Sequence, residues 1–245
     1  MHYTVSIFCL LLLAGPLTPD CHCQSERGQP DSYSVRWTPR IPLTSLAHAA
    51  EFLRRPVEPG IMMARGNDDE SGQELVGVRT GAEYVKALKA GFQPHLGIDL
   101  TGSGRFTVAH CVHQLRHAKP SRRSHVANLR LDRLRLGELP AELTPIVSGE
   151  QQQAAQIKKH GWADRTARIT EAQALKLVID GDDGKATFWT AGWGDFNGDG
   201  LEDVLLGAYY DFSPGSLSYG TTVIVTRRAS GGRLELVGRE VVRLE

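Results

Sequence analysis

A short acidic stretch near the carboxyl end contains the residues with the clearest chemistry. Side-chain oxygens recur there at every second position and once more four residues later, in Asp195, Asn197, Asp199 and Asp203. Alternate residues of a tightly coiled loop can point toward one centre, and Gly198 and Gly200 permit the backbone angles that such a coil needs. A hard cation that takes about six to eight oxygen ligands suits this donor set, so calcium is the expected occupant.

The spacing of these donors differs from that of an EF-hand loop. An EF-hand closes with a bidentate glutamate at its last position and leads into a helix. Here the corresponding residue is Leu206, and the apolar residues 204–210 predict a strand. Asp203 is therefore expected to supply the closing carboxylate, and Leu201 its backbone carbonyl. The predicted calcium ligands are Asp195, Asn197, Asp199, Leu201 and Asp203.

Two alternatives to calcium remain at this loop. Aspartate, asparagine and glycine are common in turns for conformational reasons alone, so the stretch is also compatible with a metal-free hairpin loop. A different cation is the second alternative. A metal-free loop would hold three carboxylates close together, and because like charges repel at short range, a bound cation is favoured.

The segment from Trp193 to about Val225 resembles a single FG-GAP repeat, the calcium-loop blade of integrin-alpha-like propellers and of VCBS-type secreted bacterial proteins. The resemblance rests on the acidic loop at 194–203, on Val-Leu-Leu-Gly-Ala at 204–208, and on the Gly-Thr-Thr-Val-Ile-Val run that begins at Gly220. It implies a calcium-stabilised blade that takes part in binding. The sequence contains no second copy of the repeat. Because a propeller needs several blades to close, a complete propeller is not expected.

Hydrophobic periodicity predicts an α+β fold. Residues 166–245 alternate apolar and polar side chains between turn-forming stretches such as 180–184. This pattern predicts an antiparallel meander of five or six strands, with the calcium loop as one of its hairpins. Within the turn, Asp180, Asp182 and Asp183 lack a later closing carboxylate, which favours a hairpin over a second cation site. Residues 44–165 are expected to mix helices and strands.

Helices are expected mainly in the first half. Residues 44–54 repeat apolar side chains at helical spacing, with Thr44 or Ser45 as the N-cap. Thr80 and Glu83 have the spacing of a capping box for a helix that Gly91 ends. Further predicted elements are a strand over 74–79, a strand over 97–99, a strand or buried helix over 106–115, a strand over 125–136, and a helix over 148–160.

The amino-terminal residues have the features of an export signal. An apolar run at 7–14 is too short to span a bilayer but suits a signal-peptide core. We therefore expect a signal peptide over 1–23, an extended lead-in over 24–43, and a secreted or periplasmic protein with no later membrane span. Cys111 could then pair with Cys21 or Cys23. The formal net charge is zero, which argues against a nucleic-acid partner.

Histidines in the first half suggest an alternative, enzymatic function. His110, His113 and His117 share a face if 106–118 is helical, where they could bind a transition metal; they are otherwise polar positions on a half-buried element. A secreted hydrolase would use histidines among His95, His110, His113 and His125. Ala-His-Cys at 109–111 resembles the segment around the catalytic histidine of trypsin-like proteases. The Gly-Asp-Ser-Gly setting of the nucleophile is missing from the sequence.

The sequence as a whole favours an exported, calcium-stabilised binding or interaction protein without catalytic activity. Its ligand would be an unidentified protein or a carbohydrate. Trp189 and Trp193 are four residues apart in a predicted strand, which places them on one face, more often as core than as a ligand platform. The alternatives are the secreted hydrolase and a periplasmic inhibitor or accessory subunit of a surface complex.

Overall fold

The computed structural model describes residues 32–239 apart from 66–72, 95–102, 145–161, 163–165, 183 and 213–217. All of these residues belong to one unit, which spans Asp31–Glu245. The predicted signal peptide, the strand over 97–99 and the helix over 148–160 lie outside the described residues, as do Cys21, Cys23 and His95. In the described part of the chain, the helices are all too short or too polar to cross a membrane.

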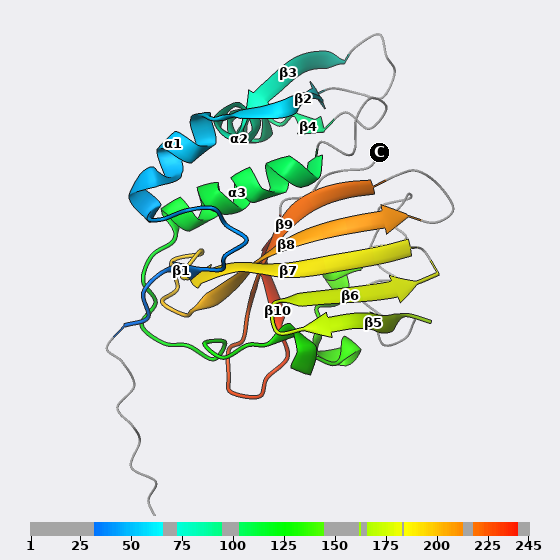
Figure 1. The fold of residues 1–245 in the computed structure, drawn as a ribbon. Helices are drawn as coiled ribbons and strands as arrows, with labels where there is room; N and C mark the ends of the chain where they lie inside the picture. The colour runs from blue at the N-terminus through cyan, green and yellow to red at the C-terminus, as the bar shows by residue number, and fades with distance from the viewer. Residues whose placement is uncertain are drawn as a thin grey trace, which may run out of the picture. The chain divides into compact units, whose positions relative to one another are not determined.

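The second half forms the predicted antiparallel meander (Figure 1). Its six strands pair in chain order: β5 (Arg168–Gln173), β6 (Lys176–Gly181), β7 (Gly184–Gly194), β8 (Asp203–Phe212), β9 (Ser218–Thr226) and β10 (Glu235–Arg239). The short β1 (Arg36–Trp37) adds to the sheet beside the end of β7. The sheet is open, which confirms the predicted α+β fold and the expectation that its strands do not close into a complete propeller.

The first half supplies three helices and a small second sheet. After a 3₁₀ turn at Leu46–His48, the elements are α1 (Ala49–Arg54), β2 (Pro56–Arg65), β3 (Glu74–Thr80), α2 (Gly81–Lys89), β4 (Gln93–Pro94) and α3 (Ser103–His117). The smaller sheet has the order β3-β2-β4. The apolar segment at 106–115 is therefore helical. In Figure 1, α3 lies between this smaller layer and the large sheet.

Capping was predicted correctly for one helix and wrongly for another. The Thr80 hydroxyl accepts from the Glu83 N–H at 3.2 Å, and the Glu83 carboxylate accepts from the Thr80 N–H at 3.0 Å, which completes the capping box of α2. Gly91 follows with φ +85°, as expected for a helix stop. In contrast, Ser45 makes no side-chain capping bond. Its hydroxyl and that of Thr44 contact the His48 ring instead.

Strand β2 was missed because its sequence begins with helix-ending prolines. Pro56 and Pro59 do follow α1, but the chain continues directly into the strand. Pairing with β3 is irregular between Pro56 and Ile61 and becomes regular only from Ile61 to Arg65. Since proline cannot donate to a ladder, it is tolerated in such an irregular strand start.

Both faces of the large sheet are covered by other parts of the same chain. Along β8, Val204, Leu206, Ala208 and Tyr210 face one hydrophobic cluster. Leu205 faces the other, together with Ala109, Val112 and Leu115 of α3. Successive strand residues point to opposite faces, so the two clusters lie on the two sides of the sheet. This arrangement explains how a single blade can bury its surfaces without neighbouring blades.

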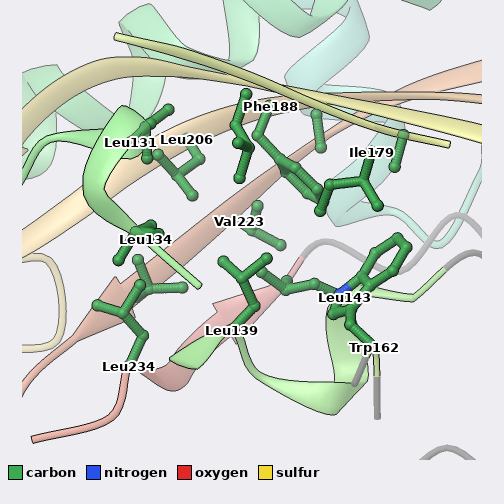
Figure 2. Close-up of a cluster of buried hydrophobic side chains, with 14 of the residues drawn as sticks. Leu131, Leu134, Leu139, Leu143, Trp162, Ile179, Phe188, Leu206, Val223 and Leu234 are labelled. Carbon is green, nitrogen blue, oxygen red and sulfur yellow. The ribbon is translucent and has the colours of Figure 1, made fainter. Parts of the chain in front are cut away.

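The segment at 125–136 is not a strand. It forms an irregular layer with 3₁₀ turns at Leu131–Arg133, Leu136–Glu138 and Ala141–Leu143. Figure 2 shows Leu131, Leu134, Leu139 and Leu143 from this layer packed against sheet residues such as Phe188 and Val223. The leucines at 129, 131 and 134 are buried without forming a strand. The layer lies on the face of the sheet, and its N–H at Leu131 donates to the Ala174 carbonyl instead of to a continuous ladder.

The expectation that Trp189 and Trp193 share a face is wrong. Trp189 belongs to the cluster beneath α3, whereas Trp193 packs against the opposite cluster. The pairing of β7 with β8 shifts register between Thr190 and Gly192. Because one extra residue moves all later side chains to the other face, this bulge separates the two indoles. Trp189 is a core residue and Trp193 is partly buried against the opposite cluster, so the two do not form a shared ligand platform.

Candidate calcium loop and the segments that hold it

The acidic stretch connects β7 to β8 as a coiled loop closed by its own backbone. Gly198 and Gly200 have φ of +82° and +83°, the left-handed region for which glycine is suited. The Asp195 carboxylate accepts the Gly198 N–H at 2.6 Å and the Gly200 N–H at 2.9 Å, one on each oxygen. The loop therefore coils tightly around the Asp195 carboxylate.

Asn197 and Asp199 repeat the same pattern further along the loop. The Asn197 side-chain oxygen accepts the Asp199 N–H at 2.9 Å, and Asp199 accepts the Leu201 N–H at 2.8 Å. The Asn197 amide also donates to the second Asp199 oxygen at 2.9 Å. A carboxylate or amide oxygen has two lone pairs, so these turns leave acceptor capacity on each of them.

Asp203 is the most unusual residue of the predicted set. Its side chain is fully buried at the first position of β8, and one oxygen accepts the Phe196 N–H at 3.1 Å. Within the described part of the chain, the other oxygen, Oδ1, has no hydrogen-bond partner. Burial is the main cause that raises the pKa of Asp203 to about 6, and the charges of Asp199 and Asp195 add to it. The Phe196 N–H opposes this rise in pKa, as does the nearby Thr226 hydroxyl, which in this structure donates to the Glu202 carbonyl at 3.3 Å instead of to Asp203. A buried acceptor with no donor is costly, and a cation would satisfy it.

The loop carboxylates are near one another, but they are turned toward backbone N–H groups. Among the described residues, no three His, Cys, Asp or Glu side chains are grouped in a way that could hold a metal ion. The set of Asp195, Asn197, Asp199, Leu201 and Asp203 therefore stays a prediction. The unpartnered Asp203 oxygen and the all-oxygen chemistry of the donors are the features that fit calcium.

The basic segment at 119–123 holds the acidic loop in place. Lys119 and Asp195 exchange backbone hydrogen bonds of 2.9 Å in both directions. The Gly200 carbonyl accepts the Arg122 N–H at 2.8 Å and the Arg123 N–H at 3.2 Å, and the Glu202 N–H donates to the Arg123 carbonyl at 2.8 Å. In the sequence, the two segments are far apart, and opposite charge is the only feature that relates them.

Glu202 is a second structural residue that the sequence did not single out. Its carboxylate is completely buried and forms a bidentate ion pair with the Arg36 guanidinium of β1. The Ser124 hydroxyl also donates to it at 2.6 Å. Arg36 in turn donates to the Ala127 carbonyl at 3.2 Å and lies over the Trp193 ring. Glu202 therefore ties the loop to β1 and to the 124–127 segment.

Residues 103–117 form the helix α3, and His110, His113 and His117 lie along one side of it. The ring centroids of His113 and His117 are 4.6 Å apart, and those of His110 and His113 are 6.4 Å apart. His110 and His113 line a cavity of about 310 Å³ between α2, α3, β9 and β10. Among the described residues that line it, none is acidic, so the histidine–carboxylate pair expected of a hydrolase is not assembled there.

His113 is expected to make the protein less stable in mild acid. Burial, helped by the charges of Lys89, His117, His110 and Arg116, lowers the pKa of His113 from 6.5 to about 4. The unfolded chain then binds the extra proton first, so stability present above pH 6.5 is lost as the pH falls toward 4. The slope from one proton is at most about 1.4 kcal/mol per pH unit. Urea unfolding across this range should give a shallower pH dependence for His113→Gln, and equal slopes would contradict the assignment.

Comparison with known families agrees with the resemblance seen in the sequence. The FG-GAP repeat model matches residues 187–225, which covers β7, the acidic loop, β8 and most of β9. FG-GAP repeats generally bind calcium and typically occur in extracellular proteins, in domains of the interaction type. Comparisons with curated proteins and with solved structures found no match. The chain therefore contains one FG-GAP repeat, built into an α+β unit.

Proposed function

We propose that this protein is an exported binding protein whose single FG-GAP blade is stabilised by one calcium ion. Asp195, Asn197, Asp199 and Asp203 supply side-chain oxygens and Leu201 its carbonyl. The ion would neutralise the three carboxylates and fix the β7–β8 connection, and its binding energy would add to folding. The role of calcium is structural, and the blade with its supporting segments serves to bind an external protein or carbohydrate.

One observation carries the calcium part of this proposal. Asp203 places a carboxylate oxygen in a fully buried position where it makes no hydrogen bond with the described residues, since the nearby Thr226 hydroxyl donates to the Glu202 carbonyl. The residue directly follows a loop with three of the other predicted oxygen ligands, Asp195, Asn197 and Asp199. Burying a charged oxygen with no partner costs free energy. A cation seated in the loop removes that cost and the repulsion among the carboxylates together.

The test compares thermal unfolding with and without calcium. The melting temperature of the wild type is expected to rise with added calcium and to fall on treatment with EGTA. Asp199→Ala should lower the melting temperature in calcium and abolish the response to EGTA. Asp211→Ala, at an exposed position of β8, serves as the control and should keep the response. A wild type that melts identically in calcium and in EGTA would remove calcium from the proposal.

The export and interaction parts need a separate experiment. Fractionation of the native host should find the mature chain outside the cytoplasm and shortened at its amino end. Capture of partners from the surface fraction would separate a general binding module from an accessory subunit or inhibitor, which would copurify with one complex in fixed ratio. A full-length chain that stays in the cytoplasm would contradict the proposal.

A further inference from the structure

Polar side chains that are fixed by hydrogen bonds, among them His110, line part of the cavity beside α3. His110 is 6% exposed and uses both ring nitrogens: Nδ1 lies 2.8 Å from the Thr222 hydroxyl, and Nε2 lies 3.0 Å from the Gln114 amide nitrogen. With the Gln114 amide as donor, Nε2 accepts and Nδ1 donates to the Thr222 hydroxyl. The pair joins α3 to β9 and leaves the second N–H of the Gln114 amide available at the cavity.

The charges around this cavity favour an anion over a metal ion. Lys89 lines it from the end of α2, and the positive charges of Lys89 and Arg116 both act on His113. None of the described lining residues carries a negative charge. A cation held by His113 and His117 would lie beside an ammonium group with no carboxylate to offset it. An anion in the cavity would instead face the Lys89 ammonium group and two neutral donors, the His113 ring and the Gln114 amide.

Much of the remaining lining is apolar. Val85 and Leu88 contribute from α2, and Ile224 from β9. The volume of about 310 Å³ is at the small end of ligand pockets. A ligand that fits both parts has one charged head and one short hydrocarbon chain.

We propose that this cavity binds a small aliphatic carboxylate. The Lys89 ammonium pairs with the carboxylate, because a charge-assisted hydrogen bond is stronger than a neutral one. The Gln114 amide and the neutral His113 ring donate to the same head group. The chain lies against Val85, Leu88 and Ile224. This site is separate from the calcium loop and does not depend on calcium being bound.

The experiment is a titration of the full chain with hexanoate, followed by amide NMR spectra. Saturable shifts are expected in α2, α3 and β9. Lys89→Gln should weaken hexanoate binding about five- to tenfold, the effect of losing one charged hydrogen bond at a partly exposed site. Lys86→Gln changes an exposed lysine of the same helix outside the lining and should leave binding unchanged. The neutral hexanamide should bind more weakly than hexanoate.

Several outcomes would overturn the proposal. They are the absence of saturable shifts with hexanoate, equal binding of hexanoate and hexanamide, or equal weakening by the two lysine variants. A separate titration with zinc alone tests for a metal site. Saturable shifts around His113 and His117 with zinc, but none with hexanoate, would assign a metal site instead. The spectrum of each variant shows at once whether it is folded. Hexanoate titrations are carried out both in calcium and in EGTA. Equal binding in the two conditions is expected, so this test does not depend on whether the loop binds calcium.

Discussion

Arg36→Leu is expected to lower the free energy of unfolding by about 3–5 kcal/mol, the usual cost of leaving one partner of a buried ion pair uncompensated. The variant removes the guanidinium from Glu202, whose carboxylate is fully buried, while the leucine keeps an apolar side chain against Trp193. Ser124 then remains as a donor to the carboxylate. For a chain of this size the loss corresponds to a decrease of roughly 6–20 °C in melting temperature.

A cycle of variants tests this explanation directly. Glu202→Gln should cost less than Arg36→Leu, because a neutral amide is cheaper to bury than an unpaired carboxylate. The double variant should be more stable than Arg36→Leu alone, which gives a coupling energy for the pair. Arg55→Leu breaks an exposed ion pair with Glu51 and should change stability by less than about 1 kcal/mol. Additive losses in the cycle would show that the pair is not coupled.

Asp203→Asn is expected to stabilise the metal-free protein and to make it insensitive to calcium. The asparagine oxygen can still accept the Phe196 N–H, but the buried position no longer carries a charge. Without calcium, the wild type has a raised Asp203 pKa, so the folded state holds its proton longer than the unfolded chain. Stability of the metal-free wild type therefore decreases as the pH rises from 3.8 to about 6. The gain in stability from Asp203→Asn in the metal-free protein should be small near pH 3.8 and should reach its full value above about pH 6.

Calcium should reverse the order of the two proteins. At a calcium concentration of about a thousand times Kd, binding adds about 4 kcal/mol to the wild type, and the variant gains nothing. Because ligands must be deprotonated to bind, this gain should shrink as the pH falls below 6. Melting curves in calcium and in EGTA at several pH values measure both effects. An asparagine variant that is less stable in EGTA, or that still responds to calcium, contradicts this role. Asp211→Asn at an exposed site provides the control.

Several features could be predicted because they depend on neighbours in the sequence. The capping box at Thr80 requires only residues three positions apart, and the loop coil requires only glycines at 198 and 200. Strand alternation from β5 to β10 follows from the period of the extended chain. The FG-GAP resemblance also rests on a contiguous run of residues, so the amino-acid order is enough to reveal it.

Other features depend on residues that are far apart in the chain. The Arg36–Glu202 pair joins positions separated by 166 residues, and composition alone cannot indicate which of many arginines meets a given glutamate. The bulge at Thr190 and Gly192 arises from pairing with β8, so spacing alone misplaced the two tryptophans. Similarly, the sequence at 125–136 predicted a strand, whereas contacts with the sheet bury its leucines along an irregular path with 3₁₀ turns.

The order of the amino acids is enough to show which residues can donate oxygens to a cation, where a blade-like meander runs, and that one repeat cannot close a propeller. What covers that blade is visible only in the folded chain: α3 lies on one face and the 3₁₀ layer on the other. The folded chain also buries Glu202 and Asp203, and it places His110 and His113 beside a cavity without acidic lining among the described residues. The reason is physical, since burial and charge environment are set by the segments that the folded chain brings together.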